Sequence, residues 1–85
     1  MRYLCTRNTD LDDLIGMESP QTQAPGFNYG PIPLAMRADE ELVLENSNTL
    51  PAILVAKVRL LVRDLFIAET EEHIRPGSGF RLVLA

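Results

Sequence analysis

The chain has 85 residues and a formal net charge of −4, with eight Lys and Arg against twelve Asp and Glu. Its length allows one domain with a small core, and its acidic balance disfavours nucleic acid, because phosphate binding needs clustered cations. A single cysteine, Cys5, excludes an internal disulfide and a zinc cluster, and we expect it to be a buried apolar residue. No stretch has the length and apolar character of a signal peptide or a bilayer-spanning helix, so we expect a soluble protein.

Residues 1–33 predict an extended N-terminal arm that carries one short helix near residues 10–15. Asp12 and Asp13 fall in the first turn of that helix, where the helix dipole favours negative charge, and Gly16 can close its C-terminal end. A helix of one or two turns is stable when its apolar face docks on something. The rest of the arm predicts a short strand at its start and a long segment without regular structure.

Residues 17–33 are rich in proline and glycine, which remove backbone donors and favour turns. We expect this part of the arm to lie along a protein surface and to be anchored there by apolar side chains. An alternative is that these side chains cover one end of the protein's own core. The predicted partner-binding residues of the arm are Leu11, Leu14, Ile15, Phe27, Tyr29 and Ile32.

Residues 34–85 predict a β-domain organised around a hairpin at Glu41–Val62. Polar turn formers at residues 47–49 separate the two strands of the hairpin, and Pro76-Gly77-Ser78-Gly79 indicates a later turn. The expected strands are residues 34–37, 41–46, 52–62, 65–70 and 80–85. The fold class predicted is therefore all-β, a small antiparallel β-sandwich or partly open barrel behind the N-terminal arm.

The segment AILVAKVRLLV at residues 52–62 decides the fold class, because it fits either a strand or a buried helix. Counted with a period of two, alternate residues from Ala52 onward are all apolar, and Lys57, Arg59 and Arg63 share the opposite face. Counted at 100° per residue, the charges spread over much of a helix, which favours the strand. The alternative is a helix with Pro51 in its first turn.

The cations Lys57, Arg59 and Arg63 would line one face of the predicted sheet. One interpretation is a solvated face, on which these cations pair with acids across the strand ladder. The other is a contact surface for an acidic partner. Both interpretations leave the opposite, apolar face of the strand in the core.

No residue pattern indicates catalysis, a cofactor or a bound metal. The acids at positions 10, 12 and 13 lack the spacing of a calcium-binding EF-hand loop, and helix capping explains them. Glu71 and Glu72 stand beside His73, but no nucleophile lies at a motif spacing from this histidine, the one in the chain. We therefore expect a protein that is not an enzyme.

The pattern of strands in the C-terminal part has a counterpart in known proteins. It consists of LVLEN, a turn, VRLLV and a final unit formed by Ile74, Pro76, Gly77, Phe80, Leu82 and Leu84. In this respect residues 34–85 resemble small β-sandwich accessory proteins of bacteriophage virions. The resemblance implies a capsid decoration or head or tail protein, located in the virion, and otherwise a cytoplasmic protein.

These observations together predict a non-enzymatic structural or assembly protein that binds repeated sites through its arm and its β-domain. Its expected partners are proteins, either copies of itself or a larger shell or tube protein in a symmetric assembly, with no nucleic acid and no membrane. The alternative is a small acidic regulator or inhibitor that occludes a basic surface of another protein.

Overall fold

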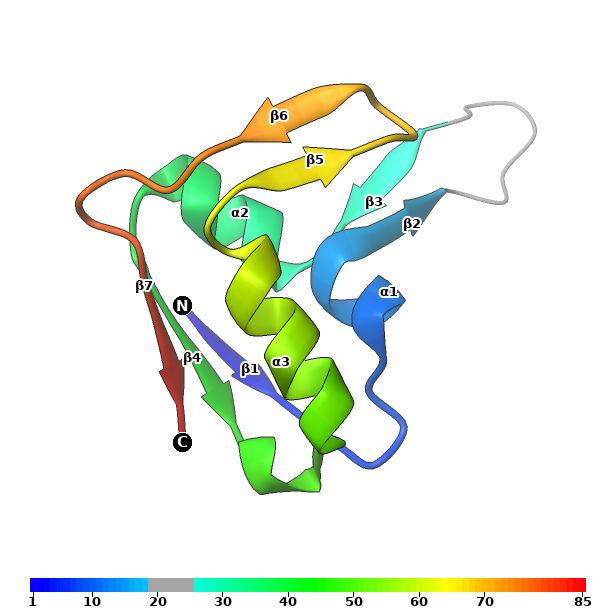
Figure 1. The fold of residues 1–85 in the computed structure, drawn as a ribbon, viewed down its shortest axis with the longest axis vertical. Coiled ribbons are helices and arrows are strands. Elements are labelled where there is room, and N and C mark those ends of the chain that lie inside the picture. The colour runs from blue at the N-terminus through cyan, green and yellow to red at the C-terminus, as the bar shows by residue number, and fades with distance from the viewer. Residues whose placement is uncertain (19–25) are drawn as a thin grey trace.

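The computed structural model describes residues 1–18 and 26–85 and has a mixed α/β architecture (Figure 1). Helices take 33% of the described residues and strands 31%, so the prediction of an all-β sandwich or barrel is wrong. In chain order the elements are β1 (Arg2–Leu4), α1 (Leu11–Ile15), β2 (Gly16–Glu18), β3 (Phe27–Tyr29), α2 (Pro31–Ala38), β4 (Glu41–Glu45), the 3₁₀ helix η1 (Ser47–Thr49), α3 (Ala52–Leu61), β5 (Leu65–Ile67), β6 (Glu72–Ile74) and β7 (Arg81–Leu84).

The main sheet is parallel and has the strand order β1-β4-β7. Tyr3, Leu44 and Leu84 occupy matched positions across its three strands, and Leu42 and Leu44 have no exposed surface. Parallel neighbours need long crossover connections, so the helices and both β-hairpins, β2–β3 and β5–β6, lie in the chain between these strands. The sheet therefore joins the two ends and the middle of the chain.

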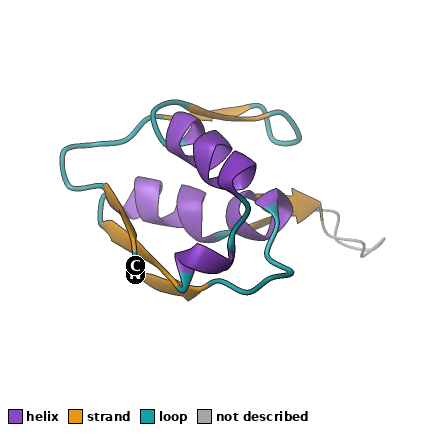
Figure 2. Cartoon of the chain, turned by 60° about the horizontal axis from the view of Figure 1, so that its bottom comes forward, coloured by secondary structure: helices purple, strands orange, loops and turns teal. Residues whose placement is uncertain are grey.

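The helices lie between the three-stranded sheet and the β5–β6 hairpin (Figure 2). Helix α2 contacts β4 on one side and β6 on the other, which makes it the central element of the fold. The apolar core is built mainly from aliphatic side chains of all these layers. Its members are Cys5, Leu14, Ile32, Ala35, Met36, Leu42, Leu44, Leu50, Leu54, Val58, Leu65, Ile67 and Ile74.

Residues of the predicted arm, 1–33, pair and pack with residues of the predicted β-domain, 34–85. Strand β1 pairs with β4, and β2 pairs with β3 in a hairpin that packs near α1 and α2. At Gly16, φ is +128°, and an added Cβ would lie 2.4 Å from the Asn28 carbonyl oxygen, so the start of this hairpin requires glycine. Residues 19–25, which fall in the predicted irregular segment, lie outside the described residues.

The predicted strand at residues 34–37 is wrong, because these residues belong to α2. Pro31 and Pro33 stand in the first turn of this helix, where a backbone N–H has no partner within the helix and its loss costs little. The two prolines therefore mark the start of a helix. Proline content alone predicts the end of an irregular arm, because it does not distinguish a helix start from a loop.

The predicted strand at residues 52–62, and with it the Glu41–Val62 hairpin, is also wrong. Residues 52–61 form α3, so the segment is helical, but Pro51 is the N-cap and does not lie in the first turn, and the helix ends at Leu61 and does not reach Thr70 as the helical alternative expected. Leu54 and Val58 face the core from this helix, but its outward face is apolar as well. Apolar residues on both faces also fit a period of two, and this explains the wrong prediction.

Candidate functional site

Helix α3 exposes apolar side chains at the centre of its outward face. Ile53 is 69% exposed and Leu60 is 66% exposed, with the exposed Ala56 between them on the same face. We call Ile53, Ala56 and Leu60 the α3 stripe. A surface helix of a globular protein normally carries polar residues at these positions, so the α3 stripe lacks a partner within the described part of the chain.

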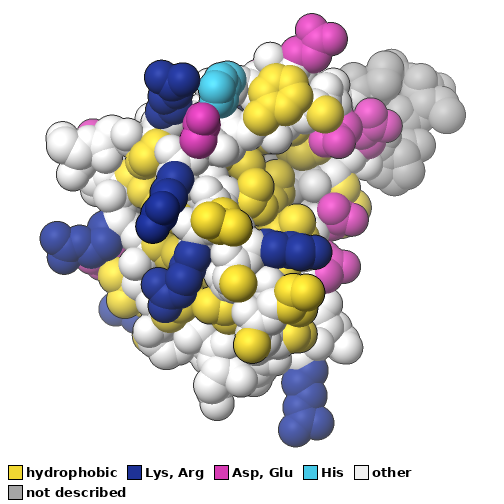
Figure 3. All heavy atoms as spheres, in the orientation of Figure 1, with side chains coloured by type: hydrophobic (Ala, Val, Ile, Leu, Met, Phe, Trp, Pro, Cys, Tyr) yellow, Lys and Arg dark blue, Asp and Glu magenta, His cyan; other side chains and the backbone are white. Residues whose placement is uncertain are grey.

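Cations border the α3 stripe on both sides. Lys57 lies on one side, and Arg59 lies on the other together with Arg63, which follows the helix end at i+4 from Arg59. None of the three forms an ion pair with a described residue, and residues 19–25 contain no acid. Figure 3 shows Lys and Arg side chains around the hydrophobic side chains over α3, with Asp and Glu along the right-hand edge.

An apolar recess of about 220 Å³ opens between α1, the C-terminal end of α3 and β5. Leu61 lines it from α3 and is four residues after Lys57, so the recess lies on the Lys57 side of the α3 stripe. Phe66 lines it from β5 and is itself 57% exposed. Asp12 and Glu69 add two carboxylates to its lining.

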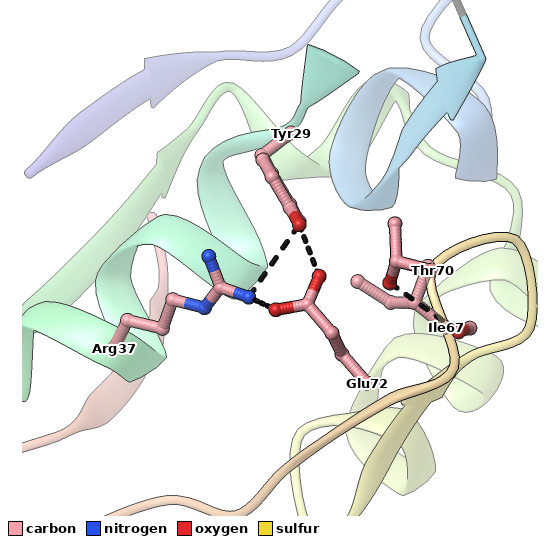
Figure 4. Close-up of polar contacts among 5 residues, drawn as sticks. All are labelled: Tyr29, Arg37, Ile67, Thr70 and Glu72. Atoms are coloured by element: carbon pink, nitrogen blue, oxygen red, sulfur yellow. Dashed lines mark hydrogen bonds and ion pairs between the residues drawn. The ribbon is translucent and has the colours of Figure 1, made fainter. Parts of the chain in front are cut away.

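A second, more polar cleft of about 510 Å³ lies where the C-terminal end of α2 meets β6. Two of its charged lining residues, Arg37 and Glu72, pair with each other (Figure 4). Glu72 contacts the Arg37 guanidinium and accepts a hydrogen bond from the Tyr29 hydroxyl, while the Arg37 Cζ lies 4.5 Å from the centroid of the Tyr29 ring. We call Tyr29, Arg37 and Glu72 the Tyr29 cluster; it joins β3, α2 and β6.

The single histidine does not belong to a catalytic arrangement in the part of the chain that the structure describes. His73 Nε2 contacts Asp64 Oδ1, and Arg75 Nε lies 3.7 Å from the same oxygen. No described hydroxyl or thiol forms a hydrogen bond with His73. Cys5 is fully buried, and burial raises the pKa of its thiol, which keeps it in the unreactive neutral form.

No group of three His, Cys, Asp or Glu residues within residues 1–18 and 26–85 is placed to hold a metal ion. Over the same residues, no helix is long and apolar enough to cross a membrane. No model of a known protein family matches the chain, and no curated protein matches it.

The six predicted arm residues come together, but in the protein's own core. Leu14 and Ile32 have no exposed surface, and the other four are half-buried against the core. The alternative interpretation of the arm expected this position against the core for Phe27, Tyr29 and Ile32. The half-buried residues are Leu11, Ile15, Phe27 and Tyr29.

The three predicted basic residues, Lys57, Arg59 and Arg63, lie beside one apolar surface, although on two sides of a helix. Sequence reasoning missed Ile53 and Leu60, which form the ends of that surface. The sequence does contain a signal for this surface. When residues are placed at 100° intervals around a helix, Ile53 and Leu60 fall between Lys57 and Arg59. The residues of the Tyr29 cluster are distant in sequence, so no local pattern could have grouped them.

Proposed function

We propose that this protein is a non-enzymatic protein-binding module and that the α3 stripe is its contact surface. The observation that carries the proposal is the exposure of Ile53 and Leu60, 69% and 66%, on a helix whose other face fills the core. Covering one such side chain contributes about 1.5–3 kcal/mol. An exposed apolar surface with a charged border is typical of a protein contact site.

The two more specific roles expected from the sequence do not enter this proposal. The resemblance to virion accessory proteins depended on a strand at VRLLV, and these residues lie in and directly after α3. The acidic-inhibitor role would need an acidic contact surface, whereas the α3 stripe is bordered by cations. A protein partner is common to all these roles and is retained.

The proposal is tested with a double variant, Ile53→Gln and Leu60→Gln, in the cells from which the protein comes. We expect that proteins which cross-link to the wild-type chain no longer cross-link to the variant. The polar glutamine side chains cannot form the apolar contact that Ile53 and Leu60 make with a partner. The free energy of unfolding should change by no more than about 0.5 kcal/mol, since both residues are exposed. Quantitative mass spectrometry and urea denaturation measure the two quantities.

Leu4→Gln is the matched control, because Leu4 is also apolar and 65% exposed but lies on β1. This variant should keep the cross-linked proteins. If the double variant keeps them as well at unchanged stability, α3 is not the binding surface and the proposal is wrong.

A further inference from the structure

The α3 stripe has the dimensions of a site for one helix. Ile53 and Leu60 are seven residues apart, so the stripe is roughly 10 Å long at 1.5 Å per residue. Two turns of an amphipathic helix, with apolar residues at i, i+3 or i+4 and i+7, match this length. The recess beside Leu61, which Asp12 and Glu69 help to line, lies beside the stripe and outside this length.

The border of the α3 stripe selects the charge of its occupant. Lys57, Arg59 and Arg63 have no carboxylate partner among the described residues, although the chain as a whole is acidic. A guanidinium can pair with a carboxylate through two parallel hydrogen bonds. Acidic side chains on both borders of an incoming helix would therefore find partners here, and basic ones would be repelled.

We infer that the α3 stripe binds an amphipathic helix of another protein whose apolar side is bordered by Asp and Glu. This inference rests on the proposed binding function and specifies the partner of the same surface. The partner helix lies along the stripe, places its apolar residues over Ile53 and Leu60, and places its carboxylates against Lys57 on one side and Arg59 and Arg63 on the other.

A second copy of this chain fits the surface less well. A two-fold axis along α3 would place Lys57 of one copy beside Arg59 of the other, and an axis across α3 would place the Arg59 and Arg63 borders together. Both arrangements bring cations against cations, which is unfavourable.

An anionic membrane is also disfavoured, because the same face carries carboxylates. Asp12 and Glu69 line the recess beside the stripe, and the net charge of the chain is −4. A bilayer covers the whole face and would bring these acids against anionic lipid, whereas a helix covers the stripe alone.

The test uses the full chain and synthetic peptides of about 18 residues, a length that supports an isolated helix. Three peptides share one leucine stripe and differ in its borders, which are Glu, Gln or Lys, and a fourth contains the residues of the Glu peptide in scrambled order. Fluorescence anisotropy measures binding. We expect the Glu peptide to bind roughly tenfold more tightly than the Lys peptide, because its carboxylates form exposed ion pairs with Lys57, Arg59 and Arg63 while the Lys peptide is repelled.

A triple charge reversal, Lys57→Glu, Arg59→Glu and Arg63→Glu, gives the second arm of the test. We expect this variant to prefer the Lys peptide, with an unchanged circular dichroism spectrum. The matched control reverses Arg2, Arg7 and Arg81, which changes the net charge equally and should leave the preference for the Glu peptide. In the wild type, NMR shifts caused by the Glu peptide should lie in residues 52–63.

Different outcomes overturn the inference and the proposed function separately. Equal binding of the Glu, Gln and Lys peptides would refute the acidic border and leave α3 as a binding surface. A dimer in light scattering that Leu60→Gln dissociates would identify a second copy as the occupant. Binding to vesicles of phosphatidylserine and phosphatidylcholine, with no binding of any peptide, would refute the helical partner and the proposed protein-binding function together.

Discussion

Tyr3 and Cys5 stand two residues apart, in β1 and directly after it, and both have a raised pKa in the folded protein. Burial raises the pKa of the Cys5 thiol. Burial also raises the pKa of the Tyr3 hydroxyl, and the negative charge of Asp13 raises it further. The folded state therefore retains protons at alkaline pH that the unfolded chain releases, and this links stability to pH.

We predict that the free energy of unfolding decreases as the pH rises above 9.0, the ordinary pKa of the thiol. Below this pH both groups are protonated in the folded and in the unfolded state, and their contribution to the free energy of unfolding is fully present. As the pH rises, the two groups ionise first in the unfolded chain. Their contribution to the free energy of unfolding therefore decreases until the pH reaches their raised pKa values in the folded state. Urea denaturation between neutral pH and about pH 10 measures the slope, because that range spans the unperturbed thiol and phenol pKa values.

The double variant Cys5→Ala and Tyr3→Phe is the control for this prediction. Its free energy of unfolding should depend less on pH over the same range, whatever its absolute stability. A slope equal to that of the wild type would show that other groups cause the alkaline loss.

Some residues behave as the sequence predicted, because their roles are local. Asp12 and Asp13 lie in the first turn of α1, and Gly16 ends it. The Asp10 carboxylate caps the helix by accepting a hydrogen bond from the Asp13 N–H, and the Asp13 carboxylate accepts one from the Asp10 N–H. Asp10 and Asp13 therefore cap the helix, and Asp12 lies in its first turn as predicted; the N-cap is Asp10, whereas the sequence favoured Asn8 or Thr9.

The Tyr29 cluster ties three elements together, and its strength can be measured in a double-mutant cycle. We predict a coupling of about 0.5–1 kcal/mol between Arg37→Met and Glu72→Gln. The estimate is modest because the two side chains are 40% and 31% exposed. Urea denaturation of the wild type, both single variants and the double variant supplies the four free energies.

The control cycle uses Arg2 and Glu45, which form an ion pair at 3.6 Å with side chains 71% and 42% exposed. Their coupling should be near zero, because solvent screens an exposed pair. Equal coupling in the two cycles would mean that the Tyr29 hydroxyl and ring add nothing to the Arg37–Glu72 contact.

At the level of elements, short strands were easier to predict than helices. Alternating residues mark β1, β4, β5 and β7, where strands were predicted, whereas β2, β3 and β6 were not predicted. Helix α3 was predicted as a strand because the residues of the α3 stripe are apolar where a surface helix is normally polar. The wrong prediction therefore concerns the surface that we propose as functional. Functional surfaces are places where residue types depart from those that the local structure favours.

At the level of the whole molecule, strand pairing could not be predicted from the sequence. Antiparallel neighbours are joined by short turns that leave a local signal, and this kind of pairing was the one predicted. The main sheet instead joins β1, β4 and β7, which are separated by helices and hairpins. No turn residue marks such a contact, so an N-terminal strand in the main sheet was interpreted as part of an arm.

This topology predicts that residues 34–85 do not fold alone. The fragment lacks β1, which covers one edge of β4, and it lacks the fully buried side chains of Cys5, Leu14 and Ile32. Loss of a buried leucine or isoleucine side chain alone costs about 2–5 kcal/mol, a large part of the usual stability of a small domain. We expect no cooperative thermal transition in circular dichroism and poor dispersion in NMR spectra.

A second fragment, residues 30–85, keeps α2 whole and should also not fold. It separates the effect of losing β1 and α1 from the effect of truncating α2. Cooperative unfolding of either fragment would restore the division into an arm and an independent domain.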